Sequence, residues 1–129
     1  MQQSKTMTVA GWTLSVLVIL FLIMDLSMKF MQLPIVLSTT EQLGWPTSSI
    51  TALAVLLLIS TTLYAFPLTS VFGAILLTGY LGGAIATHVR IGSPLFSHVL
   101  FGVYLGLFVW GGLYFRDARI RALIPLRSK

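Results

Sequence analysis

The sequence predicts an all-α protein, an integral membrane bundle of four spanning helices. Four stretches of about 17 to 20 residues contain no Asp, Glu, Lys or Arg. They cover residues 7–24, 50–66, 68–87 and 99–115. A helix rises about 1.5 Å per residue, so each stretch crosses a hydrocarbon core of about 30 Å. Hydrophobic residues make up 57% of the chain and charged residues 9%, whereas a soluble domain carries about 25% charged residues.

The first spanning helix is expected at residues 7–28. Lys5 precedes an apolar stretch longer than the core of a signal peptide, about 7 to 15 residues, and no small-x-small cleavage site follows it. We therefore expect a retained signal anchor. The loop at 31–49 holds Pro34, Gly44 and Pro46 among Ser and Thr residues. It is too polar to span a membrane, and it predicts an extracytoplasmic cap with a helical turn near Glu41.

The remaining helices are expected at residues 50–66, 68–89 and 97–115, joined by short links. Residues 116–129 alternate basic with apolar side chains and predict a short helix in the headgroup layer. A stop-transfer anchor with no specific partner is the interpretation that we favour for this tail. The length of 129 residues leaves room for one transmembrane domain, 1–129, and no second one.

Basic residues are distributed unevenly along this chain of net charge +5. Those beyond the last span are Arg116, Arg119, Arg121, Arg127 and Lys129. Basic residues beside a span mark the cytoplasmic surface of a membrane, so no nucleic-acid partner is expected. An even number of spans places Lys5 on the side of this tail and leaves Lys29 and Arg90 on the other. Both termini are therefore predicted to be cytoplasmic.

This orientation gathers most of the ionisable side chains at the extracytoplasmic end. The predicted group, termed the polar mouth, consists of Asp25, Lys29, Glu41, Tyr80, His88, Arg90 and His98. Tyr80 belongs to it because Tyr80, Ala84 and His88 follow one another at four-residue spacing on one helix face. A lipid-facing charge costs several kcal/mol, roughly, so these groups should face one another, water or headgroups. They are our candidates for a ligand-binding site.

Asp25 and Lys29 are four residues apart and share one helix face. They predict either an ion pair that anchors the helix end or a proton or cation site tuned by Lys29. His88 fits several roles: a proton carrier, a metal or haem ligand together with His98, or a donor to a quinone carbonyl. A hydrogen bond from His88 to Asp25, Glu41 or Tyr80 is the expectation that we favour.

Two pairs of glycines four residues apart predict close helix packing. Gly79 and Gly83 form a flat strip on the third helix, and Gly102 and Gly106 form one on the fourth. A short link joins these helices, so we expect the strips to face each other within the molecule. A contact between two copies of the chain is the alternative.

No motif for catalysis is present in the sequence, and no enzymatic activity is expected from it. The chain has no cysteine, which excludes thiolate nucleophiles, disulfides and Cys-ligated metals. No phosphate-binding loop, metal-ligand cluster or Ser–His–Asp arrangement is found. No metal or tightly held cofactor is predicted, apart from a quinone in one hypothesis given below.

The second half of the chain resembles the DoxX-like family of small bacterial membrane proteins. The resemblance rests on AILLTGYLGGAIATHVR at residues 74–90 and RDARIRALIPLR at residues 116–127. It implies a four-helix bundle in the bacterial cytoplasmic membrane. Relatives in the wider superfamily are linked to thiosulfate oxidation with quinone as acceptor and to membrane oxidoreductase complexes. Others resemble assembly or trafficking factors for membrane proteins.

Three functional hypotheses follow. The first is a non-catalytic membrane subunit or assembly factor, which would contact a membrane-protein partner or a second copy of itself. The second is a redox-linked subunit that binds a quinone near Tyr80, His88 and Asp25. The third is a small proton-coupled transporter. It is the least favoured, because Asp25 lies near a helix end and no acid lies midway along a span.

Overall fold

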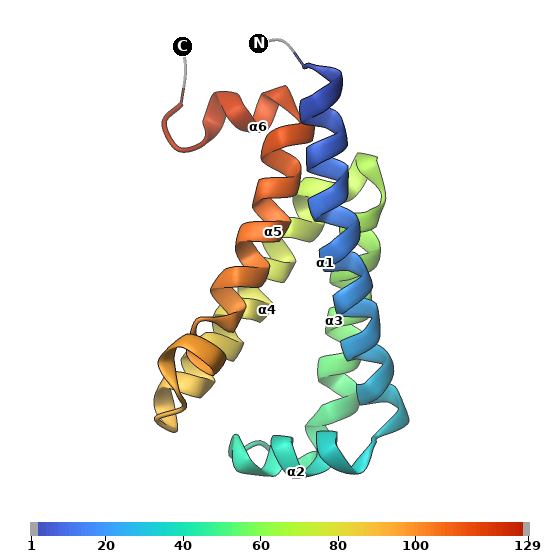
Figure 1. The fold of residues 1–129 in the computed structure, drawn as a ribbon. Coiled ribbons are helices and arrows are strands. Elements are labelled where there is room, and N and C mark those ends of the chain that lie inside the picture. Colours follow the sequence, from blue (N-terminus) through green and yellow to red (C-terminus); the bar gives the residue numbers. More distant parts are fainter. Residues whose placement is uncertain (1–2, 128–129) are drawn as a thin grey trace.

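The computed structural model describes residues 3–127, in which helices are joined by short turns (Figure 1). Its long helices are α1 (Lys5–Met31), α3 (Ile50–Ala65), α4 (Ser70–Arg90) and α5 (Phe101–Arg116). Short helical turns precede three of them, η1 (Thr47–Ser49), η2 (Pro67–Thr69) and η3 (Leu95–Val99). Two short helices, α2 (Pro34–Gln42) and α6 (Ala118–Leu123), occupy the first loop and the tail. Lys129, in the predicted basic tail, lies outside the described residues.

The four long helices, taken with their preceding turns, are long and apolar enough to cross a membrane. They span 27, 19, 24 and 22 residues. Each also presents large apolar side chains outward: Leu20, Ile59, Phe72 and Leu107 are 59%, 48%, 57% and 65% exposed. Such exposure suits lipid, which is itself apolar. The predicted all-α fold with four candidate spans is confirmed, and the chain is a multi-pass membrane protein by helix length and composition.

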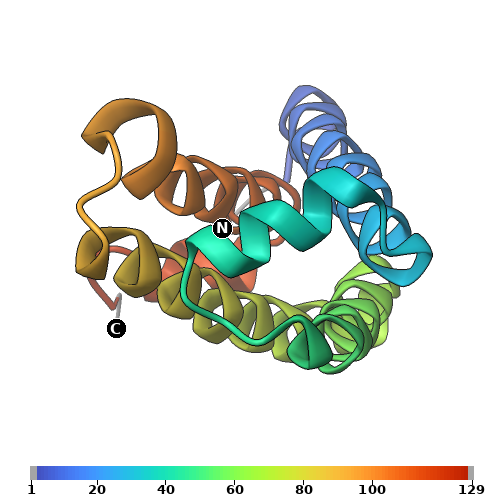
Figure 2. The same cartoon turned by 90° about the horizontal axis from the view of Figure 1, so that it is seen from below.

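The long helices form a four-membered ring. α1 packs against α3 and α5, and α4 packs against the same two helices. Figure 2 shows this ring from one end, with α2 lying across it. The centre is filled by fully buried apolar side chains: Val18, Leu22, Leu57, Leu77 and Val109.

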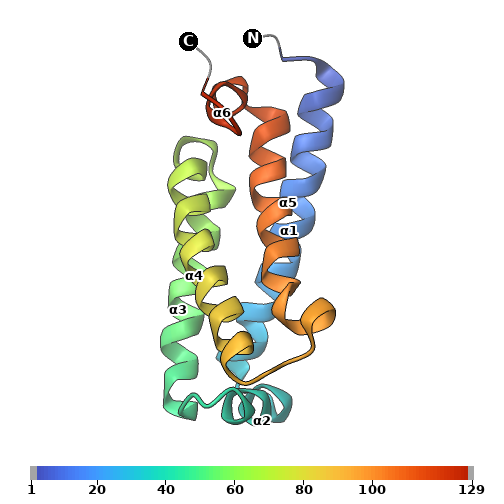
Figure 3. The same cartoon turned by 90° about the vertical axis from the view of Figure 1, so that its left-hand side faces the viewer.

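One end of the bundle, termed the closed end, is packed tightly and carries the start of α1, the η2 turn and α6 (Figures 1 and 3). A Cβ atom at Gly11 would lie 2.6 Å from the carbonyl oxygen of Gly112 and 2.6 Å from the backbone nitrogen of Arg116. Gly11 thus lets α1 and α5 approach backbone to backbone.

Polar groups complete the packing at the closed end. Tyr64 is fully buried, and its hydroxyl donates to the carbonyl of Val109 at 2.6 Å and lies 2.9 Å from the Ser15 hydroxyl. These bonds join α1, α3 and α5. In a membrane core a buried hydroxyl must find such partners inside the protein.

The opposite end, termed the open end, spreads apart, and α2 lies across it (Figures 1 and 3). α1 stops at Gln32, which has a left-handed backbone (φ 50°), and Pro34 then begins α2 as its first residue. Proline suits this position because its missing N–H would be unpaired there in any case. The expected helical turn near Glu41 is therefore part of a nine-residue helix.

The predicted contact between two glycine strips is not formed within the molecule. Cβ atoms at Gly79, Gly83 and Gly106 would meet no atom within 4 Å. Only Gly102 approaches the neighbouring helix, where its Cβ would lie 2.7 Å from Cγ1 of Ile85. The physical reason is the spreading of the open end: Gly79 and Gly83 line a cavity there instead of a helix interface.

Candidate functional site

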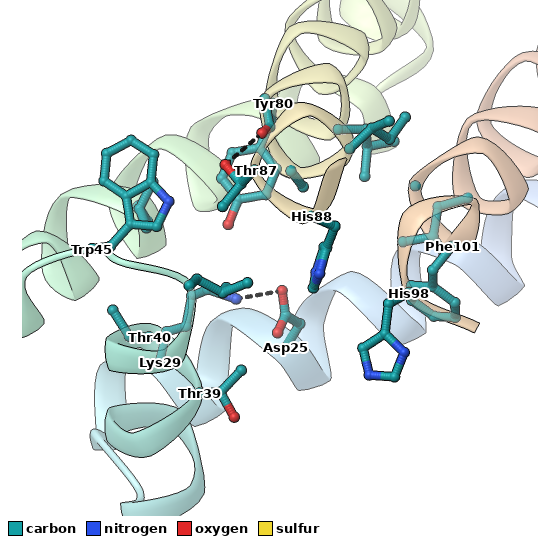
Figure 4. Close-up of a pocket in the computed structure, with 18 of the residues that line it drawn as sticks. Asp25, Lys29, Thr39, Thr40, Trp45, Tyr80, Thr87, His88, His98 and Phe101 are labelled. Carbon is teal, nitrogen blue, oxygen red and sulfur yellow. Dashed lines mark hydrogen bonds and ion pairs between the residues drawn. The ribbon is translucent and has the colours of Figure 1, made fainter. Parts of the chain in front are cut away.

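A cavity of about 570 Å³ lies at the open end. All four long helices, α2 and the η3 turn contribute to its walls (Figure 4). Most of the wall is apolar, with aromatic and aliphatic side chains from four elements: Phe21, Ile35, Leu81, Ile85, Phe101 and Leu105. Five polar-mouth residues also line it: Asp25, Lys29, Tyr80, His88 and His98. The cavity thus combines an apolar interior with a few polar groups, as ligand sites commonly do.

Asp25 and Lys29 form an ion pair inside this cavity. The Lys29 Nζ atom lies 2.7 Å from Oδ2 of Asp25 (Figure 4). The Lys29 side chain is 18% exposed and the Asp25 side chain is 35% exposed. Their four-residue spacing on α1 places both on the face toward the cavity. The pair holds opposite charges together where the surroundings are largely apolar, which lowers the cost of keeping either charge there.

His88 and His98 approach each other from α4 and η3. Their ring centroids are 5.6 Å apart and the ring planes meet at 67°. Each Nδ1 atom lies close to a serine hydroxyl: Ser93 at 2.9 Å for His88 and Ser97 at 2.7 Å for His98. If Nδ1 carries the proton, Nε2 of each ring is left as a hydrogen-bond acceptor.

The prediction that His88 bonds to Asp25, Glu41 or Tyr80 is wrong, because its partner is Ser93. α4 ends at Arg90, and Gly92 turns the chain with a left-handed backbone (φ 71°). This turn brings Ser93 back against the last helical turn, where its backbone N–H donates to the carbonyl of His88 at 3.0 Å. A local turn therefore supplies the partner that was expected from a distant helix.

Tyr80 lies deeper in the cavity than His88, two turns earlier on α4. It is half-buried, and none of the residues in the range 3–127 forms a hydrogen bond with its hydroxyl. A phenol O–H can donate one hydrogen bond, and here the open cavity leaves that bond to solvent or to a ligand. Tyr80 thus offers a donor to whatever occupies the cavity.

Glu41 and Arg90 are not part of the cavity wall. Glu41 is exposed at the end of α2. Arg90 extends over the rim, and its Nη2 atom donates to the carbonyl of Leu43 at 2.7 Å. Arg90 thereby ties the chain just after α2 to the end of α4.

Sequence reasoning missed the serines beside the two histidines and the wall provided by α2. Thr39, Thr40 and Trp45 border the cavity (Figure 4). Ser97 directly precedes His98, which is a local signal for a contact. The contribution of α2 has no such signal, since it depends on how far the helices spread.

Over residues 3–127, no three side chains of His, Cys, Asp or Glu come together in a way that could hold a metal ion. What the site offers is a set of hydrogen-bond donors and acceptors around an apolar space.

The sequence of this chain is similar to one family of known proteins. The sequence profile of the DoxX-like family matches residues 13–112, a range that covers α3, α4, most of α1 and α5, and every residue that lines the cavity. No curated protein and no solved structure matches the chain. The family match covers well over half of the sequence. The chain therefore belongs to the DoxX-like family.

Proposed function

We propose that this protein is a non-catalytic membrane subunit that holds a quinone, or a lipophilic molecule of that class, in the cavity at its open end. The observation that carries the proposal is the Tyr80 hydroxyl, a donor without a hydrogen-bond partner among residues 3–127 in a wall that is mostly apolar.

The size and lining of the cavity suit such a ligand. A volume of about 570 Å³ falls within the range of small-molecule sites, which runs from about 300 to 1,000 Å³. The apolar wall matches a hydrophobic ring and the beginning of an isoprenoid chain. Phe21 and Phe101 contribute rings whose centroids are 5.3 Å apart, and flat ligand rings pack well against such surfaces.

The polar groups match the head of a quinone, which carries two carbonyl acceptors. Tyr80 supplies one donor, and the Lys29 ammonium group supplies another. A ligand bound by one or two hydrogen bonds within an apolar wall needs no covalent or metal contact. The missing catalytic motifs therefore favour a binding subunit over an enzyme.

Charge distribution supports an orientation for this site. Basic residues outnumber acidic ones strongly at the closed end, and basic residues concentrate on the cytoplasmic side of membranes. We infer that both termini are cytoplasmic, that the cavity opens toward the extracytoplasmic side, and that the membrane is the cytoplasmic membrane of a bacterium.

A second candidate is an assembly factor that contacts a partner helix. Gly82 on α4 is exposed, and a Cβ atom there would meet nothing within 4 Å. Thr78 and Ala86, one turn to either side, are also exposed. Such a strip of small residues allows a neighbouring helix in the membrane to approach closely.

Native mass spectrometry of the purified protein tests both candidates, because it reports bound small molecules and stoichiometry together. The proposed function predicts a retained quinone and a rise in melting temperature when a soluble short-chain quinone is added. Tyr80→Phe should weaken binding of that quinone about fivefold, the value of one hydrogen bond of about 1 kcal/mol. Tyr114→Phe, at the closed end, is the matched control and should bind normally.

Two outcomes would contradict the quinone proposal: no shift in melting temperature with added quinone, or equal binding by Tyr80→Phe and the unchanged protein. A species containing a second chain and no small molecule would favour the assembly factor instead.

A further inference from the structure

We propose that the closed end is a binding surface for the headgroups of anionic phospholipids. The surface, termed the basic platform, is built on α6 and the start of α1, with Lys5, Arg119 and Arg127 as the contacting residues. This inference is independent of the cavity at the other end.

The position of α6 is the first argument. Asp117 breaks the helix with an extended backbone (φ −133°, ψ 109°), so that α6 turns away from α5. α6 then lies across the bundle axis: it runs sideways in Figure 1 and is seen end-on in Figure 3. A helix in this orientation lies parallel to the plane of the membrane.

Depth is the second argument. The segment Leu95–Arg116 contains 22 residues, which as a helix cover about 33 Å, close to the hydrocarbon thickness of about 30 Å. Arg116 and α6 therefore lie at the level of the lipid phosphates. At this level Arg116 stacks over Trp12, with its guanidinium carbon 3.9 Å from the ring centroid. Tryptophan prefers this zone of the membrane.

α6 is held firmly on the bundle. Arg121 donates from Nη1 to the carbonyls of Tyr114 at 2.7 Å and Phe115 at 3.1 Å, and from Nη2 to Oε1 of Gln3 at 2.7 Å. Arg121 thereby satisfies the last carbonyls of α5 and ties α6 to the start of the chain. Arg119, which lies on α6, is thus presented on a fixed support.

The surface of α6 and the residues after it suits the boundary between headgroups and acyl chains. Ile120 is 5% exposed and packs into the core of the bundle. Leu123 and Leu126 are 55% and 83% exposed. Exposed apolar side chains beside basic ones are typical of a segment that lies in the interface.

Charge decides which lipid is bound. Over the part of the chain that the structure describes, the closed end carries the basic residues Lys5, Arg116, Arg119, Arg121 and Arg127 and one acid, Asp117. Both carboxylate oxygens of Asp117 already accept hydrogen bonds from Arg119. The excess of positive charge at phosphate depth favours a lipid with net negative charge over a zwitterionic one.

Native mass spectrometry with equal amounts of phosphatidylglycerol and phosphatidylcholine tests the proposal. Both lipids carry a phosphate and are used with the same acyl chains. They differ in the headgroup, which is glycerol with a net negative charge in one and zwitterionic choline in the other. The unchanged protein should retain more phosphatidylglycerol than phosphatidylcholine. The double variant Arg119→Gln, Arg127→Gln removes two charges and should reduce that ratio at least about fivefold, which is the effect of removing a single charge near a membrane surface.

Two further variants separate charge from folding. Arg119→Lys, Arg127→Lys keeps the charge and should restore the ratio. Arg90→Gln removes a basic residue from the open end and should leave it unchanged. Equal retention of both lipids by the unchanged protein, an unaltered ratio in the double glutamine variant, or an equal loss in Arg90→Gln would overturn the proposal.

Discussion

Asp117 acts as the junction between a spanning helix and an interfacial one. Its Oδ1 atom accepts from the backbone N–H of Arg119 at 2.9 Å, which caps α6, and from the Arg119 side chain at 3.1 Å. Hydrogen bonds from the Arg119 side chain lower the pKa of Asp117 below its ordinary value, although partial burial opposes the shift. A single carboxylate thus sets both the direction and the stability of the tail.

Asp117→Ala should loosen α6 while leaving the spanning helices intact. Loss of an N-cap costs about 1 kcal/mol, so amide exchange across Ala118–Leu123 should accelerate about fivefold by hydrogen–deuterium exchange mass spectrometry. Asp117→Asn keeps the capping oxygen and should show a smaller change. Acceleration across α5 as well would contradict this local role.

The same junction should be sensitive to pH. Because the pKa of Asp117 is lowered in the folded protein, its stabilising effect is complete above the ordinary Asp pKa, near 4. It is lost as the pH falls through the lowered value. The protection of α6 amides, taken as their exchange rate relative to the intrinsic rate at each pH, should therefore fall below about pH 4, and Asp117→Asn should abolish this loss of protection. A pH dependence that persists in Asp117→Asn would assign it to another group.

At the scale of elements, small residues have opposite roles at the two ends of the bundle. At the closed end Gly11 and Gly112 allow α1 and α5 to touch. At the open end Gly79 and Gly83 leave space, which becomes the cavity. Spacing four residues apart therefore indicates a flat helix face, but not whether a helix or a ligand covers it.

Gly11→Ala and Gly106→Ala should change stability in opposite directions. The new methyl group at Gly11 meets backbone atoms that cannot move aside, which should cost about 1 to 3 kcal/mol. The methyl group at Gly106 meets nothing within 4 Å, and alanine favours a helix over glycine by about 1 kcal/mol. Thermal unfolding in detergent measures both. Equal losses of stability in the two variants would contradict the close backbone approach of α1 and α5 at Gly11.

At the scale of the whole molecule, the protein has one rigid end and one end that opens. The closed end contains the Tyr64 hydrogen bonds and the Arg121 hydrogen bonds that hold α6 on α5. The open end contains the cavity, and α2 lies across it. Within the open end, the hydrogen bond from Arg90 to the carbonyl of Leu43 joins the chain just after α2 to the end of α4. A ligand site at a spread end of a bundle can be reached without disturbing the core at the other end.

The orientation in the membrane can be tested because the chain contains no cysteine. Gln42→Cys, on α2, and Arg119→Cys, on α6, each create a single reactive site. A membrane-impermeant maleimide added to intact cells should label Gln42→Cys, and should label Arg119→Cys only after the cells are lysed. The reverse pattern would invert the orientation, and labelling of both in intact cells would contradict a cytoplasmic tail.

The sequence by itself determined the four spanning helices, since long uncharged stretches in lipid have no stable alternative to helix. It also brought Asp25, Lys29, Tyr80, His88 and His98 toward one end, because helix direction and four-residue spacing follow from the chain alone. Tertiary structure decided the rest. How far α4 and α5 spread from α1 and α3, and that Ser93 rather than Asp25 meets His88, depend on packing and turn geometry. Helix spreading depends on how side chains from distant segments pack together, and the Ser93–His88 contact depends on the backbone geometry of the turn at Gly92. The order of residues does not reveal either.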